Sequence, residues 1–240
     1  MTACTGQSLA LDNGTIMRDF EICKVCRDKP CVNECPYDAL SLTGREIMTD
    51  ELMDCISRDI PFYRNSGGGV TFSGGEPFHQ PAFLTGMLKR CKESGIHTAV
   101  ETCGWTTQSV LLGTIPLVDL FLFDLKIIDP EKHLRYTGKP VGPILENLAL
   151  LASVHPEIVI RFPLIPVITD TRENLTDILN VMKQNKLTRI GLEPYHSLGV
   201  EKYAEHGLEY TYSDVKIYES EDLETAKLFF EGHGISAEIV

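Results

Sequence analysis

Short strand-like segments alternate with longer helical segments over most of this 240-residue chain, from Glu46 to the last residue. Runs of β-branched, aromatic and other apolar residues predict strands at 69–72, 97–101, 117–125, 158–163, 189–193 and 235–240. Apolar residues at helical spacing predict helices at 49–59, 80–94, 144–154, 172–186 and 221–231, and Asp129-Pro130-Glu131 marks the start of another. Strands that alternate with helices in this way form parallel βαβ units. The run 117–125 is almost continuously apolar, so we expect it to be buried on both faces.

Polar residues stand at the carboxyl ends of the predicted strands. They are Ser73, Glu101, Asp124, Arg161 and the segment 193–196. The active sites of (β/α) barrels are assembled from several strands at this end of the barrel. We therefore predict an α/β fold over residues 44–240, a partial (β/α)6 TIM-like barrel rather than an open doubly wound sheet.

The charge balance and the apolar runs exclude several classes of partner. Lys and Arg number 22 against 34 for Asp and Glu, which gives a formal net charge of −12. Such a chain has no electrostatic attraction for nucleic acid or for an anionic membrane surface. No stretch approaches the roughly 20 apolar residues of a membrane span, and the first residues lack the pattern of a signal peptide. We therefore expect a cytoplasmic protein, in which disulfides are rare.

Five of the eight cysteines fall within the first 35 residues. Four of them form the run CKVCRDKPCVNECP, whose spacing is C-x2-C-x4-C-x3-C-P. A bacterial iron–sulfur run reads C-x2-C-x2-C-x3-C-P, so this copy has two additional residues in its middle. The run predicts a 4Fe–4S cluster, and a zinc knuckle or free thiols are the alternatives. Cys55 and Cys91 lie in helical patterns and are predicted to be small buried residues.

Two similar strings, CTGQSLALDNGTIMRD and CPYDALSLTGREIMTD, begin at Cys4 and Cys35. In two-cluster ferredoxins, the last cysteine of each run binds the other cluster. By that logic Cys4 joins Cys23, Cys26 and Cys31 around one cluster. Cys35 then serves a second cluster whose other ligands are not in this sequence. Residues 1–43 are thus predicted to be part of a ferredoxin-like 4Fe–4S module.

Residues 66–81, SGGGVTFSGGEPFHQP, place two glycines and an acid directly after a predicted strand. Gly74 and Gly75 allow the backbone to approach a ligand closely. The carboxylate of Glu76 can then receive an ammonium group. A Gly-Gly pair alone is usually only a turn, but this pair follows a strand and precedes an acid.

SGGEP, followed by VETCG, DLK, IRFPLIP and EPYHSLG on the later strands, resembles the radical S-adenosylmethionine enzymes. The resemblance covers essentially the whole chain. It is strongest to the glycyl-radical-enzyme activating enzymes of the pyruvate formate-lyase activase class that carry a ferredoxin-like insert. It implies an oxidoreductase of anaerobic metabolism whose cofactors are a 4Fe–4S cluster and S-adenosylmethionine. It also implies a glycyl radical enzyme as partner and an electron donor such as flavodoxin or ferredoxin.

The activity that this resemblance implies is the reductive cleavage of S-adenosylmethionine to a 5′-deoxyadenosyl radical, which removes hydrogen from a glycine of the partner. The glycines and acid of SGGEP would bind the methionyl amino group. Lys126 would bind the methionyl carboxylate, and Glu101, with Thr102, would stand near the cofactor. Cys103 occupies a position where other members have Asn, and its role is left open. The implied cofactor-binding residues are Gly74, Gly75, Glu76, Glu101, Asp124, Lys126, Arg161 and His196.

A zwitterionic methionine end needs a carboxylate and one or two cations that converge on it. Glu76, Lys126 and Arg161 supply this set. The alternative for the two cations is a strand-end salt bridge to Asp124.

The family's C-x3-C-x2-C motif, which holds the cluster that reduces S-adenosylmethionine, occurs nowhere in this sequence. The family's order of parts therefore implies a barrel that lacks its first unit. The alternatives are a non-catalytic iron–sulfur and S-adenosylmethionine-binding fragment, a pseudoenzyme that binds a partner, or a radical enzyme that acts on a small molecule. The sequence predicts no catalytic side chain and does not identify which glycyl radical enzyme is the partner.

Overall fold

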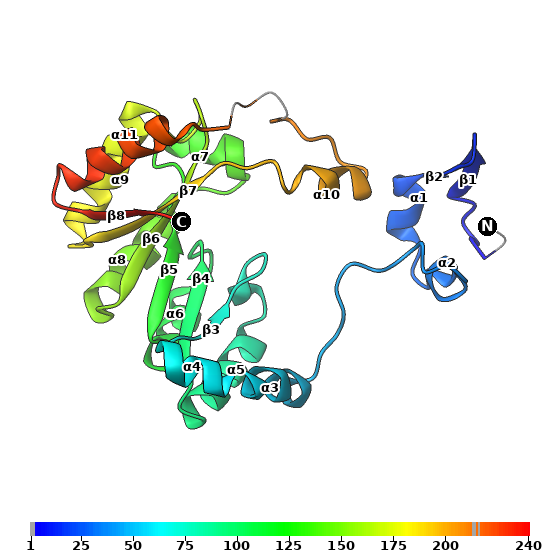
Figure 1. Ribbon diagram of the computed structural model, residues 1–240, viewed down its shortest axis with the longest axis horizontal. Helices are drawn as coiled ribbons and strands as arrows, with labels where there is room; N and C mark the ends of the chain where they lie inside the picture. The colour runs from blue at the N-terminus through cyan, green and yellow to red at the C-terminus, as the bar shows by residue number, and fades with distance from the viewer. Residues whose placement is uncertain (1–2, 213–214, 216) are drawn as a thin grey trace. The chain divides into compact units, whose positions relative to one another are not determined.

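The computed structural model describes residues 3–212, 215 and 217–240. The chain forms two compact units, which are described separately here (Figure 1). The cysteine unit comprises Met1–Ile47 and Ser197–Ser213, and the sheet unit comprises Met48–His196 and Asp214–Val240. The predicted boundary lies between residues 43 and 44. The cysteine unit instead extends to Ile47 and also includes Ser197–Ser213, a segment distant in the sequence.

A β-hairpin begins the cysteine unit. Its strands β1 (Leu9–Asp12) and β2 (Thr15–Arg18) are antiparallel, with Leu9 opposite Arg18. Asn13 and Gly14 connect them, and both have positive φ, 48° and 83°. Two central residues with positive φ form the type I′ turn, whose twist matches that of the paired strands.

Three short helices complete the cysteine unit: α1 (Phe20–Val25), α2 (Pro30–Asn33) and α10 (Val200–Glu205). Asp19 caps α1, because its side chain accepts hydrogen bonds from the backbone N–H groups of Glu21 and Ile22. None of the three helices contains a buried residue.

The segment Ser197–Ser213 packs against the hairpin and α1 through Arg18 and Phe20. The Arg18 guanidinium donates a hydrogen bond to the carbonyl of Glu205 and lies 4.1 Å from the centroid of the Phe20 ring. Gly207 has φ of 66°, and a Cβ at this position would lie 2.3 Å from the Phe20 ring. Only glycine therefore allows this close approach.

The sheet unit is built on six parallel strands in the order β3-β4-β5-β6-β7-β8. They are β3 (Gly69–Phe72), β4 (His97–Thr102), β5 (Leu120–Asp124), β6 (Ile158–Leu164), β7 (Arg189–Pro194) and β8 (Ser236–Ile239). All six strands predicted from the sequence are confirmed. The order is strictly sequential, so each strand pairs with the next one along the chain.

The helices of the sheet unit include all of those predicted from the sequence. They are α3 (Thr49–Arg58), α4 (Ile60–Ser66), α5 (Pro81–Glu93), α6 (Gln108–Thr114), α7 (Pro130–Thr137), α8 (Gly142–Val154), α9 (Arg172–Gln184) and α11 (Ser220–Glu231), with 3-10 turns η1 (Pro77–His79) and η2 (Ile115–Leu117). At α7 the expected cap is present, since the Asp129 side chain accepts from the Lys132 N–H. Of the helices that the structure describes, none is long and apolar enough to cross a membrane.

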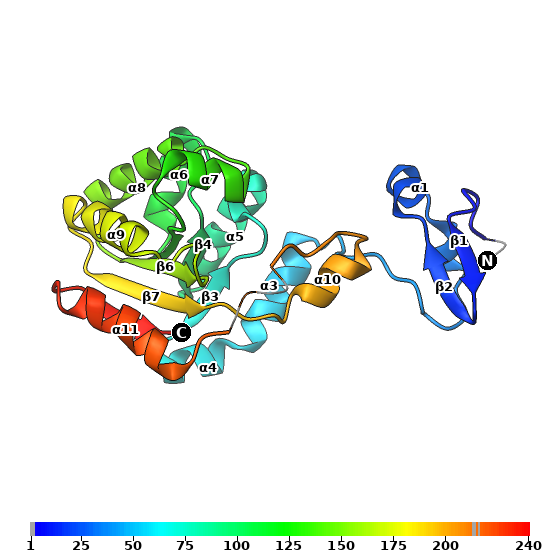
Figure 2. The same cartoon turned by 90° about the horizontal axis from the view of Figure 1, so that it is seen from above.

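The helices that connect the strands cover one face of the sheet (Figures 1 and 2). Right-handed crossovers between sequential parallel strands place every connecting helix on the same face. A doubly wound sheet, in contrast, has helices on both faces. The structure thus confirms an α/β fold with a parallel sheet, and its one-sided arrangement is consistent with part of a barrel.

The main core lies between the sheet and these helices. Phe121 and Phe123 of β5, Phe162 of β6, Leu148 of α8 and Phe230 of α11 are completely buried there. Residues of β5 and β6 alternate between buried and half-buried. Our expectation that 117–125 is buried on both faces is therefore wrong, because the face of the sheet without helices is only partly covered.

Candidate functional site

A cavity of about 160 Å³ lies beyond the carboxyl ends of β3, β4 and β5. Three predicted cofactor residues line it, Glu76, Asp124 and Lys126, and Cys103 lies beside them. They come from three consecutive strands of the sheet, as expected for a site at this end of parallel strands.

The carboxylate of Glu76 is occupied by donors of this chain. Oε1 accepts from the hydroxyl of Thr102 at 2.7 Å and from the N–H of Phe78 at 3.1 Å. Oε2 accepts from both the N–H and the thiol of Cys103, each at 3.0 Å. The sequence suggested that this carboxylate was free to receive an ammonium group, and the structure instead gives it four donors.

Gly74 and Gly75 leave open space around their backbone. Gly74 has φ of 119°, a conformation that side-chain-bearing residues rarely adopt. No atom lies within 4 Å of a Cβ built at either glycine. Within the part of the chain that the structure describes, no hydrogen bond engages their backbone N–H or C=O groups. These groups are therefore available to a ligand.

Asp124 and Lys126 form an ion pair, with Lys126 Nζ 2.8 Å from Asp124 Oδ2. The other carboxylate oxygen, Oδ1, is buried and has no hydrogen-bond partner among the described residues. Burial raises the pKa of Asp124 above its ordinary value, while the neighbouring Lys126 opposes this rise. A buried acceptor without a donor is rare in folded proteins and indicates that a ligand or water completes the site.

Arg161 of β6 stands beside Asp124, its register partner on β5. Its guanidinium forms an ion pair with Glu193 of β7, and its Nε is buried with no hydrogen-bond partner among the described residues. The salt bridge to Asp124 that the sequence left open is therefore present for Lys126, whereas Arg161 pairs with Glu193 instead.

Five of the predicted cofactor residues are not among those that line the cavity: Gly74, Gly75, Glu101, Arg161 and His196. Glu101 is half-buried on β4 opposite Leu122 of β5, and its charge contributes to the raised pKa of Asp124. His196 follows the end of β7 and is exposed. The structure thus does not bring His196 together with the other predicted residues.

The cavity has further lining residues that the sequence did not single out: His79, Trp105, His133, Thr137 and Lys139. The Lys139 ammonium lies 5.2 Å from the centroid of the Trp105 ring. His133 is buried on α7, and its Nδ1 lies 2.7 Å from the Lys139 carbonyl oxygen. Because a carbonyl only accepts, Nδ1 carries the proton and donates to it. The capping sequence predicted where α7 begins. It did not indicate that His133 and Thr137 of this helix line the cavity at the strand ends.

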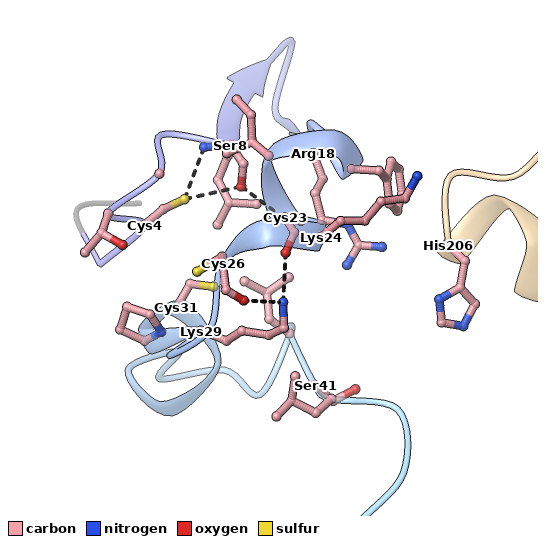
Figure 3. A pocket seen from close by; sticks show the side chains of 18 of the residues that line it. Cys4, Ser8, Arg18, Cys23, Lys24, Cys26, Lys29, Cys31, Ser41 and His206 are labelled. Carbon is pink, nitrogen blue, oxygen red and sulfur yellow. Dashed lines mark hydrogen bonds between the residues drawn. The ribbon is translucent and has the colours of Figure 1, made fainter. Parts of the chain in front are cut away.

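The cysteine unit contains a separate cavity of about 500 Å³, shown in Figure 3. Cys4, Cys23, Cys26 and Cys31 all line it. Ser8 connects two of them: its N–H donates to Cys4 Sγ at 3.2 Å, and its hydroxyl oxygen lies 3.0 Å from Cys23 Sγ. The hydrogen bonds from Ser8 lower the pKa of the Cys4 thiol.

Lys29 closes the loop that carries these cysteines. Its ammonium donates to the carbonyl oxygens of Cys23 at 2.8 Å and Cys26 at 3.0 Å. Among the described residues, no three His, Cys, Asp or Glu side chains are gathered closely enough to hold a metal ion as they stand. The four thiols thus surround a common cavity without converging on one point.

Cys35 does not line this cavity. Its thiol accepts from the Ala39 N–H at 3.3 Å, and the backbone N–H groups of Tyr37 and Ala39 lower its pKa. Of the two cysteines predicted to be small buried residues, Cys91 is completely buried, but Cys55 is only half-buried on α3.

Comparisons with known proteins agree on one family. The model of the Radical SAM superfamily, named after S-adenosylmethionine, matches residues 31–193. The 4-hydroxyphenylacetate decarboxylase activating enzyme of Clostridioides difficile is 40% identical over 98% of this chain and 76% of its own length. The isethionate sulfite-lyase activating enzyme of Oleidesulfovibrio alaskensis is 38% identical over 83% of this chain and 65% of its own length.

A solved structure extends this similarity to three dimensions. It is a domain of a pyruvate-formate lyase-activating enzyme from Bacteroides vulgatus, which matches with a TM-score of 0.61 and 28% identity. The match covers 72% of this chain and 99% of the solved domain. Sequence and fold therefore place the chain in the radical S-adenosylmethionine superfamily, among the glycyl-radical-enzyme activating enzymes.

Proposed function

We propose that this chain provides the S-adenosylmethionine-binding strand ends and the auxiliary iron–sulfur module of a glycyl-radical-enzyme activating enzyme. Enzymes of this superfamily use a 4Fe–4S cluster and S-adenosylmethionine. In the proposed activity these two cofactors would supply a 5′-deoxyadenosyl radical to remove hydrogen from a glycine of the partner enzyme. The observation that carries the proposal is the strand-end cavity, where groups from three consecutive strands meet beside the unpartnered, buried Oδ1 of Asp124.

Residues that line this cavity, together with neighbouring groups at the strand ends, fit the methionyl end of S-adenosylmethionine. Lys126 offers an ammonium for the carboxylate, and the free backbone carbonyls of Gly74 and Gly75 offer acceptors for the amino group. The buried Oδ1 of Asp124 and Nε of Arg161 are further acceptor and donor positions that a polar ligand would satisfy. These residues bind and orient the cofactor. Glu101 and His196 complete the proposed set, and the exposed His196 would have to approach the bound cofactor.

The cysteine cavity fits an auxiliary 4Fe–4S cluster bound by Cys4, Cys23, Cys26 and Cys31. Four thiols line one cavity, and the Ser8 N–H already donates to one of the sulfur atoms, as backbone groups do around clusters. Cys35 lies apart from them, which supports its assignment to a second cluster. One half of a two-cluster ferredoxin-like module would have its cysteines divided in this way. The module would pass electrons from a donor such as flavodoxin or ferredoxin, or help to dock the glycyl radical enzyme.

The cluster that reduces S-adenosylmethionine has no ligand set in this sequence, because C-x3-C-x2-C is absent. The first-named relative is matched over only 76% of its length, so it contains sequence with no counterpart here. We propose that the corresponding part of the full enzyme holds the first barrel unit with this motif. The absent motif is also what favours the second candidate function, a non-catalytic fragment that binds a cluster, the cofactor or a partner.

Anaerobic reconstitution with iron, sulfide, reductant and S-adenosylmethionine tests the proposed activity. We expect 5′-deoxyadenosine from a form that includes a C-x3-C-x2-C segment, and none from the 240 residues alone. Electron paramagnetic resonance of an added glycyl radical enzyme would then show a glycyl radical. Absence of 5′-deoxyadenosine from the longer form would contradict the catalytic proposal.

The DNA immediately upstream provides an independent check. An in-frame C-x3-C-x2-C segment is the expected finding. An in-frame stop codon directly before Met1 would instead support the non-catalytic alternative.

A further inference from the structure

Glu76, Thr102 and Cys103 form a hydrogen-bonded group that ties the loop after β3 to the end of β4. Glu76 Oε1 accepts from the Thr102 hydroxyl at 2.7 Å, and Oε2 accepts from the Cys103 N–H and thiol at 3.0 Å each. We call this group the Glu76 latch. An ionised carboxylate only accepts hydrogen bonds. The Thr102 hydroxyl and the Cys103 N–H and thiol are therefore the donors in all three contacts.

The Cys103 thiol stays protonated in this position. Burial raises the pKa of Cys103 to about 11, and the hydrogen bond to Glu76 and its negative charge contribute to the rise. At neutral pH the thiol is therefore a permanent donor to Glu76. It is not a reactive thiolate, in contrast to a catalytic cysteine.

A second row of contacts holds the donors of the latch in place. Thr102 Oγ1 accepts from the Gly104 N–H at 2.8 Å, which leaves its own proton for Glu76. The buried Asn147 of α8 donates to the carbonyls of Gly104 and Thr106, both at 2.8 Å. Gly104 has φ of 72°, and a Cβ there would lie 2.4 Å from the Phe123 ring, so only glycine fits. The latch is thus connected to the main core.

Gly74 and Gly75 directly precede Glu76, the residue that the latch holds. Neither glycine has a side chain or hydrogen bond within the described chain that would hold it. The Glu76 carboxylate is thus the nearest anchor of two residues with intrinsically high backbone freedom. Fixing this carboxylate reduces the conformations open to the adjacent carbonyl groups.

We propose that Cys103 and Thr102 are positioning residues that hold Glu76, so that the backbone carbonyls of Gly74 and Gly75 face the ammonium group of S-adenosylmethionine. In this arrangement Glu76 acts through the backbone beside it rather than as a direct carboxylate ligand. The inference deepens the proposed function and rests on it for the identity of the ligand. The latch itself is a property of this chain and can be tested without any cofactor.

The contact between Cys103 and Glu76 is tested by the alkylation rate of Cys103, measured by mass spectrometry with iodoacetamide under anaerobic conditions. Glu76→Gln removes the negative charge beside the thiol, which is one cause of its raised pKa, so we expect faster alkylation of Cys103. The half-buried Cys55 of α3 is the internal control, and its rate should not change. An unchanged Cys103 rate, or an equal rise at Cys55, would overturn the latch.

The role toward the cofactor is tested by equilibrium dialysis of S-adenosylmethionine against the cluster-reconstituted protein. Cys103→Ala should weaken binding on the order of tenfold, since a hydrogen bond to a charged group is lost. Cys103→Ser retains a donor and should recover most of the affinity. Wild-type affinity in Cys103→Ala would overturn the positioning role. A wild-type protein that binds no S-adenosylmethionine would overturn the proposed function, while the alkylation result would still decide the latch.

Discussion

The sheet unit and the cysteine unit hold their candidate ligand groups in different ways. In the sheet unit, Glu76 is fixed by four donors, and the network behind it reaches a large apolar core. In the cysteine unit, four thiols surround a cavity, where Ser8 contacts the sulfur atoms of Cys4 and Cys23 and Lys29 holds two backbone carbonyls. No hydrophobic side chain described in that unit is buried. The first site is therefore organised by the protein alone, whereas we propose that the second is organised by the cluster that it binds.

This contrast follows from the amount of apolar surface that each unit can bury. A small unit without a hydrophobic core is usually stabilised by a disulfide or a metal. The structure has the eight cysteines as free thiols, so in our proposal the bound cluster would stabilise the cysteine unit. Metal binding energy then becomes folding energy, as in other small metal-dependent domains.

Iron removal should give the largest difference between the two units. We expect chelation to abolish amide protection throughout residues 3–47 and 197–212, because the cluster supplies most of the stability there. Strands β4 to β7 should keep their protection, since their core needs no metal. Hydrogen–deuterium exchange with mass spectrometry, before and after chelation, measures both units in one sample. Equal loss of protection in both units would remove the contrast.

Substitution of single cysteines should show which of them bind the auxiliary cluster and whether Cys35 is one of these ligands. Cys4→Ala should lower the iron content and change the visible absorption of the reconstituted 240-residue chain. Cys35→Ala should leave both unchanged, because Cys35 lies outside the cavity that the other four cysteines line. The opposite result, with iron lost only in Cys35→Ala, would make the crossed assignment wrong.

Large-to-small substitutions should have unequal effects in the two units. Phe162→Ala removes a completely buried ring from the main core and should lower the free energy of unfolding by about 3–5 kcal/mol. Ile16→Ala in the hairpin removes a side chain that is 48% exposed and should cost less than about 0.5 kcal/mol. Urea denaturation followed by tryptophan fluorescence of Trp105 and by circular dichroism measures both. Similar costs would indicate a core in the cysteine unit.

The smallest expected effect concerns the stability of the sheet unit in alkali. Cys103 has its folded pKa raised from 9.0 to about 11, so the folded state holds this proton more tightly than the unfolded state. Its contribution is fully present below pH 9 and is lost as the pH rises toward 11. The free energies of unfolding of wild type and Cys103→Ser, from urea denaturation at pH 8 to 11, should converge over this range by at most about 2 kcal/mol. Parallel curves would show that folding does not raise the pKa of this thiol.

The regular part of the fold could be predicted because its signals are local. The strands β3 to β8 are short runs of β-branched and aromatic residues between helical patterns, and Asp129-Pro130 correctly marked the start of α7. The hairpin β1–β2 was not predicted, although Asn13-Gly14 is a strong local turn signal.

The candidate site could be predicted only as a set of strand ends. The sequence indicated that Glu76, Asp124 and Lys126 would lie together, and the cavity brings them together. It could not show that Thr102 and Cys103 occupy the Glu76 carboxylate, because that depends on how the loop after β3 folds back onto β4. Nor could the sequence show that His133 lines the cavity, because this depends on the position of α7 relative to the sheet.

The cysteine unit is discontinuous, because it needs Ser197–Ser213 as well as Met1–Ile47. The intervening chain must therefore be closed into a loop of roughly 150 residues before Arg18 can reach the Glu205 carbonyl. Closing a flexible loop of that length costs about 4 kcal/mol in chain entropy. A cluster inserted into a ribosome-bound chain that ends before Ser197 would meet an incomplete cavity lacking His206 and Leu208.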